Sequence, residues 1–205
     1  GLLKTKAFTF FGAYPSYDLI VGKKTRLHFT KPRKGVVYEA RPCTAKNLGV
    51  GMLTMYLDAS GVIDGKPFKG VGYVQKVVLV APFIPWNWMR VVFKDKSVLD
   101  VFVAKLSVRG LEYRVVSTGS YRLASGKTFN LSGSHFKKLD GGRWQLVGNG
   151  FTAYLKTYAF KPFVLKGRGE FHYDEYFVEC TDFAFNGKNK QNGLGMIEDA
   201  YGFMI

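Results

Sequence analysis

The chain has 205 residues and a formal net charge of +15 at pH 7. Its 47% hydrophobic and 22% charged residues are typical of a folded globular protein and exclude a disordered chain. No apolar run reaches the roughly 18 residues of a membrane-spanning helix, and the two cysteines, Cys43 and Cys180, form no CxxC pair or Cys/His cluster that would indicate zinc.

Short alternating segments predict β-strands along the whole chain. Apolar and polar residues alternate in runs of about 6–10 residues, which Gly, Asn, Asp or Pro residues separate. Turn signals stand at Asp64-Gly65, at 94–96, at 140–143 and at Asn186-Gly187. In chain order, strands are expected over 6–11, 24–30, 36–40, 51–58, 90–93, 97–104, 111–117 and 119–123. Because no long helical period interrupts them, we expect an all-β fold with antiparallel sheets, as a barrel or a sandwich.

Two segments of the chain echo each other. Residues 64–75 and 186–198 both read [D/N]-G-K, then a short loop, then G-x-G-x-x-[Q/E], which ends at Gln75 and Glu198. The likeness suggests a duplicated half, although two glycine-rich hairpins can also look alike without common origin. The paired glycines do not open helices, so a dinucleotide-binding loop is excluded by context.

A family resemblance rests on three stretches. They are Gly70-Val71-Gly72-Tyr73-Val74-Gln75, the segment from Ala81 to Arg90 with its Trp86-Asn87-Trp88, and the glycine-rich segment 193–202 with Glu198. They resemble the lipocalin-like superfamily of carotenoid 1,2-hydratases (hydroxyneurosporene synthases) and AttH-type proteins, mainly over 61–103 and 165–202. The resemblance implies a partial first lipocalin-like β unit over 1–80 and a second unit over 81–205. It also implies an aromatic-lined cavity for an apolar, isoprenoid- or lipid-like molecule.

The resemblance further implies a reaction, the addition of water to an isolated C=C bond. Such a site needs a proton donor, a positioned water molecule and aromatic faces that stabilise a cation. Glu198 is the candidate acid, and Gln75 and Asp199 are further candidate catalytic residues. Gln75 departs from the acidic or histidine-rich motif of the hydratases, and an amide cannot donate a proton at neutral pH. Whether the chain is an enzyme stays open at this point.

The candidate ligand-binding residues are aromatic, with one arginine: Trp86, Trp88, Arg90, Tyr73 and Tyr201. Alternation places Trp86, Trp88 and Arg90 on one face of a strand. Structural alternatives stay open, because the tryptophans suit a core and Glu198 suits a buried ion pair with Arg90 or Lys76. The three histidines are isolated from one another in the sequence, so no metal and no cofactor are expected.

The positive charge supports a second hypothesis, a non-enzymatic basic β-sheet that binds nucleic acid or serves as a subunit of an assembly. That hypothesis predicts exposed aromatic residues beside cations, at Tyr113-Arg114 and Tyr121-Arg122. The charge also admits contact with an anionic surface or membrane. Because no signal peptide is recognisable and the cysteines are few, we expect a cytoplasmic location.

Overall fold

The computed structural model describes residues 1–31, 38–45, 48–80, 85–108, 111–190 and 192–204. Over these residues the chain is almost entirely β-strand, and apart from one 3₁₀ turn, η1 (Asp140–Gly142), the described residues form no helix. All described strand pairs are antiparallel, so the predicted all-β, antiparallel fold class is confirmed. The chain divides into two units, Gly1–Ala81 and Pro82–Ile205.

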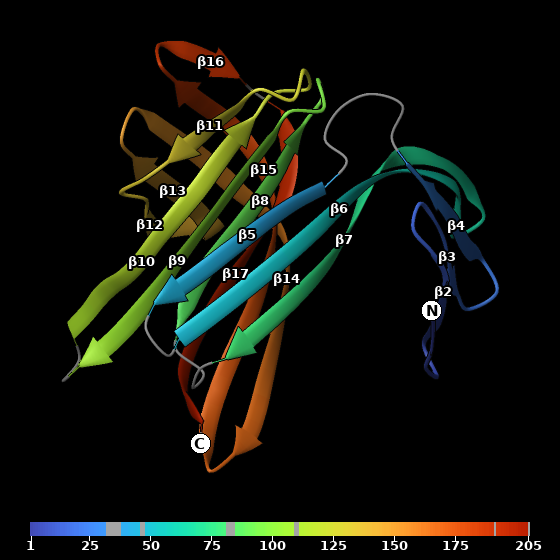
Figure 1. Cartoon of the computed structure of the whole chain (residues 1–205), viewed down its shortest axis with the longest axis horizontal. Helices are drawn as coiled ribbons and strands as arrows, with labels where there is room; N and C mark the ends of the chain where they lie inside the picture. The colour runs from blue at the N-terminus through green and yellow to red at the C-terminus, as the bar shows by residue number, and fades with distance from the viewer. Residues whose placement is uncertain (32–37, 46–47, 81–84, 109–110, 191, 205) are drawn as a thin grey trace. The chain divides into compact units, whose positions relative to one another are not determined.

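The first unit is one antiparallel sheet built around its longest strand, β6. One edge of β6 pairs with β4 near the C-terminal end and with β5 near the N-terminal end, while β7 pairs along its other edge. The sheet order is β1-β2-β3-β4-β6-β5, with β7 beside β6 (Figure 1). Its strands are β1 (Leu2–Lys4), β2 (Phe8–Ala13), β3 (Ser16–Val21), β4 (Thr25–Thr30), β5 (Tyr38–Ala45), β6 (Leu48–Ile63) and β7 (Lys66–Val80).

The second unit is an antiparallel sheet of ten strands in the order β11-β10-β9-β8-β17-β15-β14-β13-β12, with β16 on β15. The last long strand, β17, is inserted between β8 and β15 and so lies near the middle of the sheet. The strands are β8 (Trp86–Phe93), β9 (Val98–Val108), β10 (Leu111–Arg122), β11 (Thr128–Leu131), β12 (His135–Leu139), β13 (Arg143–Gly148), β14 (Phe151–Gly167), β15 (Gly169–Phe185), β16 (Lys188–Lys190) and β17 (Gly193–Met204).

The sheet of the second unit curls so strongly that distant strands touch. Tyr121 on β10 and Phe183 on β15 are four strand spacings apart in the hydrogen-bonded order, about 19 Å along a flat sheet. Their ring centroids nevertheless lie 4.9 Å apart. Only a sheet that folds back on itself brings these rings together, and its concave side encloses the core.

One face of the curled sheet, which we name the inner face, carries the core. Met89, Val91 and Phe93 of β8 point to this face, as does Ile197 of β17. Alternation therefore assigns the even-numbered residues of β8 and β17 to the opposite side, the outer face. Close strand contact in this region depends on Gly195, where a side chain would meet the backbone oxygen of Arg90.

The predicted turns are also found. Asp64 and Gly65 join β6 to β7, and Asn186 and Gly187 join β15 to β16, each pair with positive φ at both residues as a type I′ turn requires. The boundary expected at 80/81 borders residues 81–84, which lie outside the described residues. That both units are lipocalin-like and related by duplication stays a prediction.

Candidate functional site

The alternation along β8 and β17 divides the site residues expected from the sequence between two faces. Asp199 and Tyr201 belong to the inner face, where they line a cavity. Trp86, Trp88 and Glu198 belong to the outer face, because they alternate with the core residues of the same strands. The structure thus separates Glu198 from the cavity, although it is the next residue to Asp199.

On the outer face, Glu198 lies among aromatic side chains and beside a second carboxylate. The indole Nε1 of Trp86 donates a hydrogen bond to Glu198 Oε2 at 3.2 Å, and Glu175 stands directly opposite Glu198 in the β15–β17 ladder. Burial raises the pKa of Glu198, and the neighbouring Glu175 raises it further, while hydrogen bonds from Tyr173 and Trp86 act in the opposite direction. Burial also raises the pKa of Glu175.

Arg90 and Trp88 form a buried group on the outer face, next to Glu198, which stands opposite Trp88 in the ladder. The Arg90 guanidinium pairs with Asp100 of β9, and both side chains are almost fully buried. The guanidinium also lies 4.8 Å from the centroid of the Trp88 ring, as a cation–π contact. Arg90 pairs with Asp100, and its charge also lowers the pKa of Glu198, so the two residues interact as one of the sequence alternatives expected. The side chain of Lys76 lies outside the described residues.

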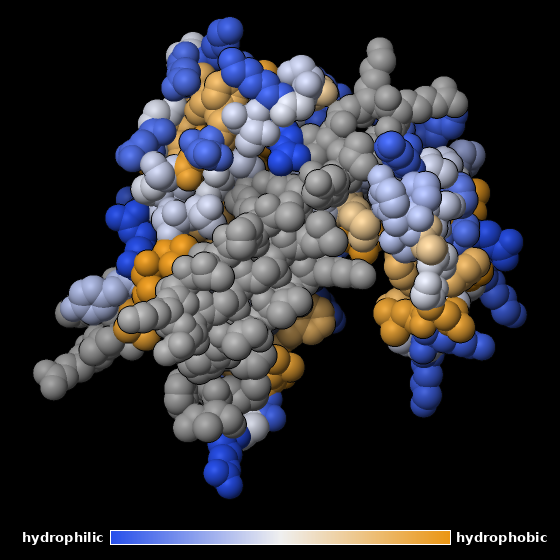
Figure 2. Space-filling model, viewed as in Figure 1, coloured by the Kyte–Doolittle hydropathy of each residue, from blue (hydrophilic) through white to orange (hydrophobic). Residues whose placement is uncertain are grey.

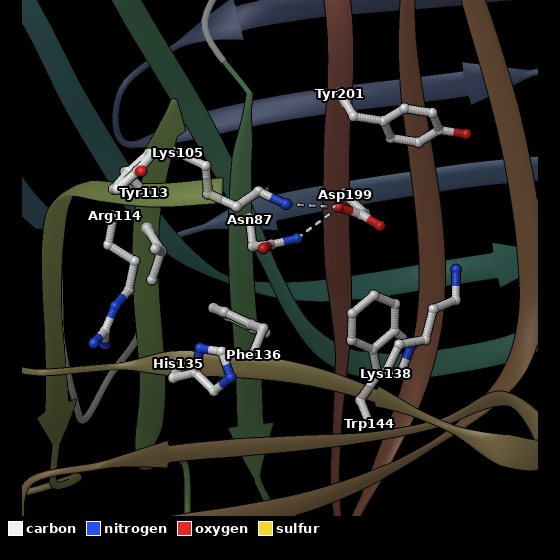
Figure 3. Close-up of a pocket in the computed structure, with 11 residues that line it drawn as sticks. Asn87, Lys105, Tyr113, Arg114, His135, Phe136, Lys138, Trp144, Asp199 and Tyr201 are labelled. Carbon is white, nitrogen blue, oxygen red and sulfur yellow. Dashed lines mark hydrogen bonds and ion pairs between the residues drawn. The ribbon is translucent and has the colours of Figure 1, made fainter. Parts of the chain in front are cut away.

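The inner face holds a cavity of about 570 Å³ in the second unit (Figure 3). Strands from both ends of the curled sheet contribute to its wall. The lining combines aromatic, cationic and amide side chains with one carboxylate: Asn87, Val103, Lys105, Tyr113, Arg114, His135, Phe136, Lys138, Trp144, Asp199 and Tyr201.

A hydrogen-bonded group forms the most buried polar part of this wall. Asn87 Nδ2 donates to Asp199 Oδ1 at 2.7 Å, and Lys105 Nζ reaches the same oxygen at 3.4 Å, as the dashed lines of Figure 3 show. The side chains of Lys105 and Asp199 are 12% and 17% exposed. Because three neighbouring strands hold these groups, their positions are fixed by the ladder and not by a loop.

A second polar chain runs along the wall from β12 to β17. Lys138 Nζ donates to the Tyr176 hydroxyl at 2.6 Å, and the hydroxyls of Tyr176 and Tyr201 lie 3.4 and 3.3 Å from Asp174 Oδ2. Asp174 stands opposite Asp199 in the ladder, so two carboxylates lie side by side on this face. Burial is the largest cause that raises the pKa of Tyr176 and of Tyr201, so both phenols keep their protons at neutral pH.

Trp144 lines the cavity and carries an unpaired buried donor. Its side chain is 3% exposed, and its Nε1 is buried with no hydrogen-bond partner among the described residues. The Lys138 ammonium lies 5.2 Å from the centroid of the Trp144 ring. An unpaired buried N–H costs about 1–3 kcal/mol, which a hydrogen-bond acceptor brought within its reach would recover.

Two residues of the expected site belong to the first unit. Tyr73 and Gln75 lie on β7, where Gln75 Nε2 donates to Thr54 Oγ1 at 3.3 Å. The catalytic and ligand-binding roles expected for Tyr73, Gln75 and the residues of the second unit stay predictions.

The nucleic-acid hypothesis required exposed rings at Tyr113 and Tyr121. Tyr113 is exposed, but Tyr121 is 3% exposed and packs against Phe93 and Phe183 in the core. One of its two stacking positions is therefore wrong. Among the described residues no group of three or more His, Cys, Asp or Glu side chains could hold a metal ion, and no helix is long and apolar enough to span a membrane.

Sequence reasoning missed several residues of the cavity. Lys105, Lys138 and Trp144 lie on β9, β12 and β13, outside the stretches that carry the family resemblance. Asn87 was passed over between the two tryptophans of Trp86-Asn87-Trp88. Alternation could have found Asn87, because its side chain points to the face opposite that of Trp86 and Trp88. That is the face of Asp199, which stands opposite Asn87 in the ladder. Only the curl of the sheet brings β12 and β13 to the same cavity.

Comparison with known proteins gives little further guidance. No family model matches the sequence, and no curated protein matches it. Among solved structures, the chain is similar to kievitone hydratase from Nectria haematococca, with 12% identity, a TM-score of 0.41, and coverage of 98% of this chain and 82% of that chain. A likeness of this size carries no assignment, so the function is argued from the cavity.

Proposed function

We propose that the second unit binds a small organic molecule that has an apolar body and one acidic or strongly accepting group. The observation that carries the proposal is the cavity of about 570 Å³, whose wall holds the buried, hydrogen-bonded group of Asn87, Lys105 and Asp199. This volume lies within the roughly 300–1,000 Å³ that is usual for small-molecule sites. Convergent polar groups inside an aromatic wall are the usual means of fixing the orientation of such a ligand.

The charges of the lining favour an anion. Lys105, Arg114 and Lys138 are cationic and line the cavity, against the carboxylate of Asp199 in the lining and that of Asp174 beside it on the same face. This excess of positive charge attracts a carboxylate, sulfonate or phosphate group, while the rings of Trp144 and Phe136 offer apolar contact. An isoprenoid- or lipid-like acid fits these requirements. A pure hydrocarbon would bury the polar group without supplying any hydrogen bond.

The reaction implied by the family resemblance, hydration of a C=C bond, forms the second part of the proposal. Hydration places a proton on one alkene carbon and the hydroxyl of water on the other, and the water returns its second proton to a base. Asp199 is the base of this proposal because its carboxylate lies in the cavity. Glu198, the acid expected from the sequence, faces the other side of the sheet and does not reach a molecule in this cavity, so its role as proton donor is proposed only for a molecule on the outer face.

Titration with anilinonaphthalene sulfonate, an anionic aromatic dye, tests the binding proposal. We expect saturable dye fluorescence, and energy transfer from tryptophan that weakens in Trp144→Phe but not in a variant changed at a distant turn, Lys94→Gln. Dye that binds without saturation, or equally well to chain in which Asn87, Lys105 and Trp144 are all replaced, would overturn the proposal. Once a native ligand is identified, turnover by Asp199→Asn and Glu198→Gln tests the two catalytic roles separately.

A further inference from the structure

The β14–β15 hairpin extends beyond the rest of its sheet. β13 pairs with β14 only from Phe151 to Lys156, while β15 pairs with it as far as Gly167. Residues 157–168 of β14 and the following turn, which we name the arm, therefore form an edge with no second strand partner among the described residues (Figure 1).

The arm exposes large apolar side chains on both of its faces. Tyr158 is 62% exposed, and four further apolar residues are exposed by more than a third: Phe160, Phe163, Val164 and Leu165. Phe160 pairs with Tyr176 across the hairpin on the inner face, and Phe163 pairs with Tyr173 on the outer face. Five large exposed apolar side chains gathered on one short segment are typical of a site of interaction.

The charge of the arm is positive. Lys161, Lys166 and Arg168 lie between the aromatic residues and at the tip, and residues 157–168 contain no Asp or Glu. Across the hairpin, the half-buried Glu175 stands opposite Lys161, and the exposed Glu170 stands opposite Lys166 and also pairs with His172. In Figure 2 the lower end of the molecule, where the hairpin ends, shows apolar and hydrophilic residues side by side. Aromatic rings beside lysine and arginine are the combination that binds the interface of an anionic membrane.

Other occupants fit the arm less well. Pro162 interrupts the edge because it has no N–H, and Lys161 beside it discourages pairing with another strand, so β-sheet extension by a second copy is disfavoured. Two copies would also bring together chains with a net charge of +15 each.

We propose that the arm docks on the surface of a lipid bilayer rich in anionic headgroups. Phe160, Phe163 and Leu165 insert between the headgroups, and Lys161, Lys166 and Arg168 contact the anionic lipid. This surface is distinct from the cavity, and the proposal does not depend on what the cavity binds.

Sedimentation of the full chain with lipid vesicles tests this proposal. We expect binding to phosphatidylcholine vesicles that contain phosphatidylserine, weak binding to phosphatidylcholine alone, and release by salt. The variant Lys161→Gln/Lys166→Gln/Arg168→Gln should reduce partitioning on the order of 100-fold, since each cation near such a surface contributes about a factor of five. Phe160→Ser/Phe163→Ser should reduce it as well, with charge unchanged.

A matched control distinguishes the effect of net charge from the effect of the position of the charges in the arm. Lys23→Gln/Lys24→Gln/Lys94→Gln removes the same charge from exposed turns and should retain binding. Equal loss in the arm and control variants would overturn the proposal, because net charge alone would then explain the binding. Absence of vesicle binding would also overturn it, and so would an arm-dependent dimer or oligonucleotide complex in its place. Circular dichroism of each variant confirms that the sheet is intact.

Discussion

Replacing Lys105 by methionine isolates the electrostatic part of the binding proposal. The change keeps an unbranched apolar stem of similar reach and removes the ammonium group with its charge. Lys105 is 12% exposed, and its ammonium lies 3.4 Å from Asp199 Oδ1, so an anionic ligand group in the same cavity would lie within a few ångströms. At about 5 Å and an effective dielectric constant of about 20–40, one charge pair is worth about 2–3 kcal/mol.

Asp199 already balances part of the Lys105 charge, so the net effect on an anion should be smaller. We expect the dissociation constant of anilinonaphthalene sulfonate to rise about 5–30-fold, equivalent to about 1–2 kcal/mol. The neutral naphthalene dye prodan should bind with an affinity that changes less than about twofold, and Lys127→Met, outside the cavity lining, serves as the control. Equal weakening of both dyes would refute the electrostatic reasoning, because it would show a loss of structure and not of charge recognition.

Four further changes test individual features of the second unit. Trp144→Phe removes the unpaired buried N–H together with part of a packed core ring, so the free energy of unfolding in urea should fall by less than about 3 kcal/mol, while the affinity for an acidic ligand falls several-fold. Tyr121→Ala removes a ring that joins distant strands of the curled sheet, so the free energy of unfolding in the same assay should fall by about 3–5 kcal/mol. A fall of less than about 1 kcal/mol would contradict the curl. Gly195→Ala would force β17 away from the backbone of β8 and should destabilise by about 1–3 kcal/mol or more, visible as a lower melting temperature. The pKa of Glu198 in the folded state lies above its ordinary value of 4.5, so the native state holds this proton more tightly than the unfolded state does. The free energy of unfolding of the parent chain, relative to that of Glu198→Gln, should therefore fall as the pH rises above about 4.5. A difference that stays constant across a pH series of unfolding curves would be the contrary result.

The sequence predicted the strands and turns well because their signals are local. Alternating side chains mark a strand, and Asp64-Gly65 marks a type I′ turn, without reference to the rest of the chain. The sequence pattern did not predict the order of the strands in the sheets. The insertion of β17 between β8 and β15 joins residues more than a hundred positions apart, and no local pattern encodes that pairing.

The candidate site was only partly accessible for the same reason. Asp199 and Tyr201 were selected because they neighbour Glu198 in a glycine-rich strand, and the structure places both at the cavity. Because side chains alternate along a strand, Glu198 points to the other face. Alternation therefore determines that Asp199, and not Glu198, lines the cavity. Lys138 and Trp144 enter the site through the curl of the sheet, which depends on long-range packing.

Native mass spectrometry of the purified chain, combined with organic extraction, tests the central claim most directly. The account predicts a bound molecule of small mass, extractable as an apolar acid, whose occupancy falls in Lys105→Met and is kept in Lys127→Met. A chain that carries no small molecule, and that also fails to bind anilinonaphthalene sulfonate saturably, would contradict the claim that this cavity is a ligand site.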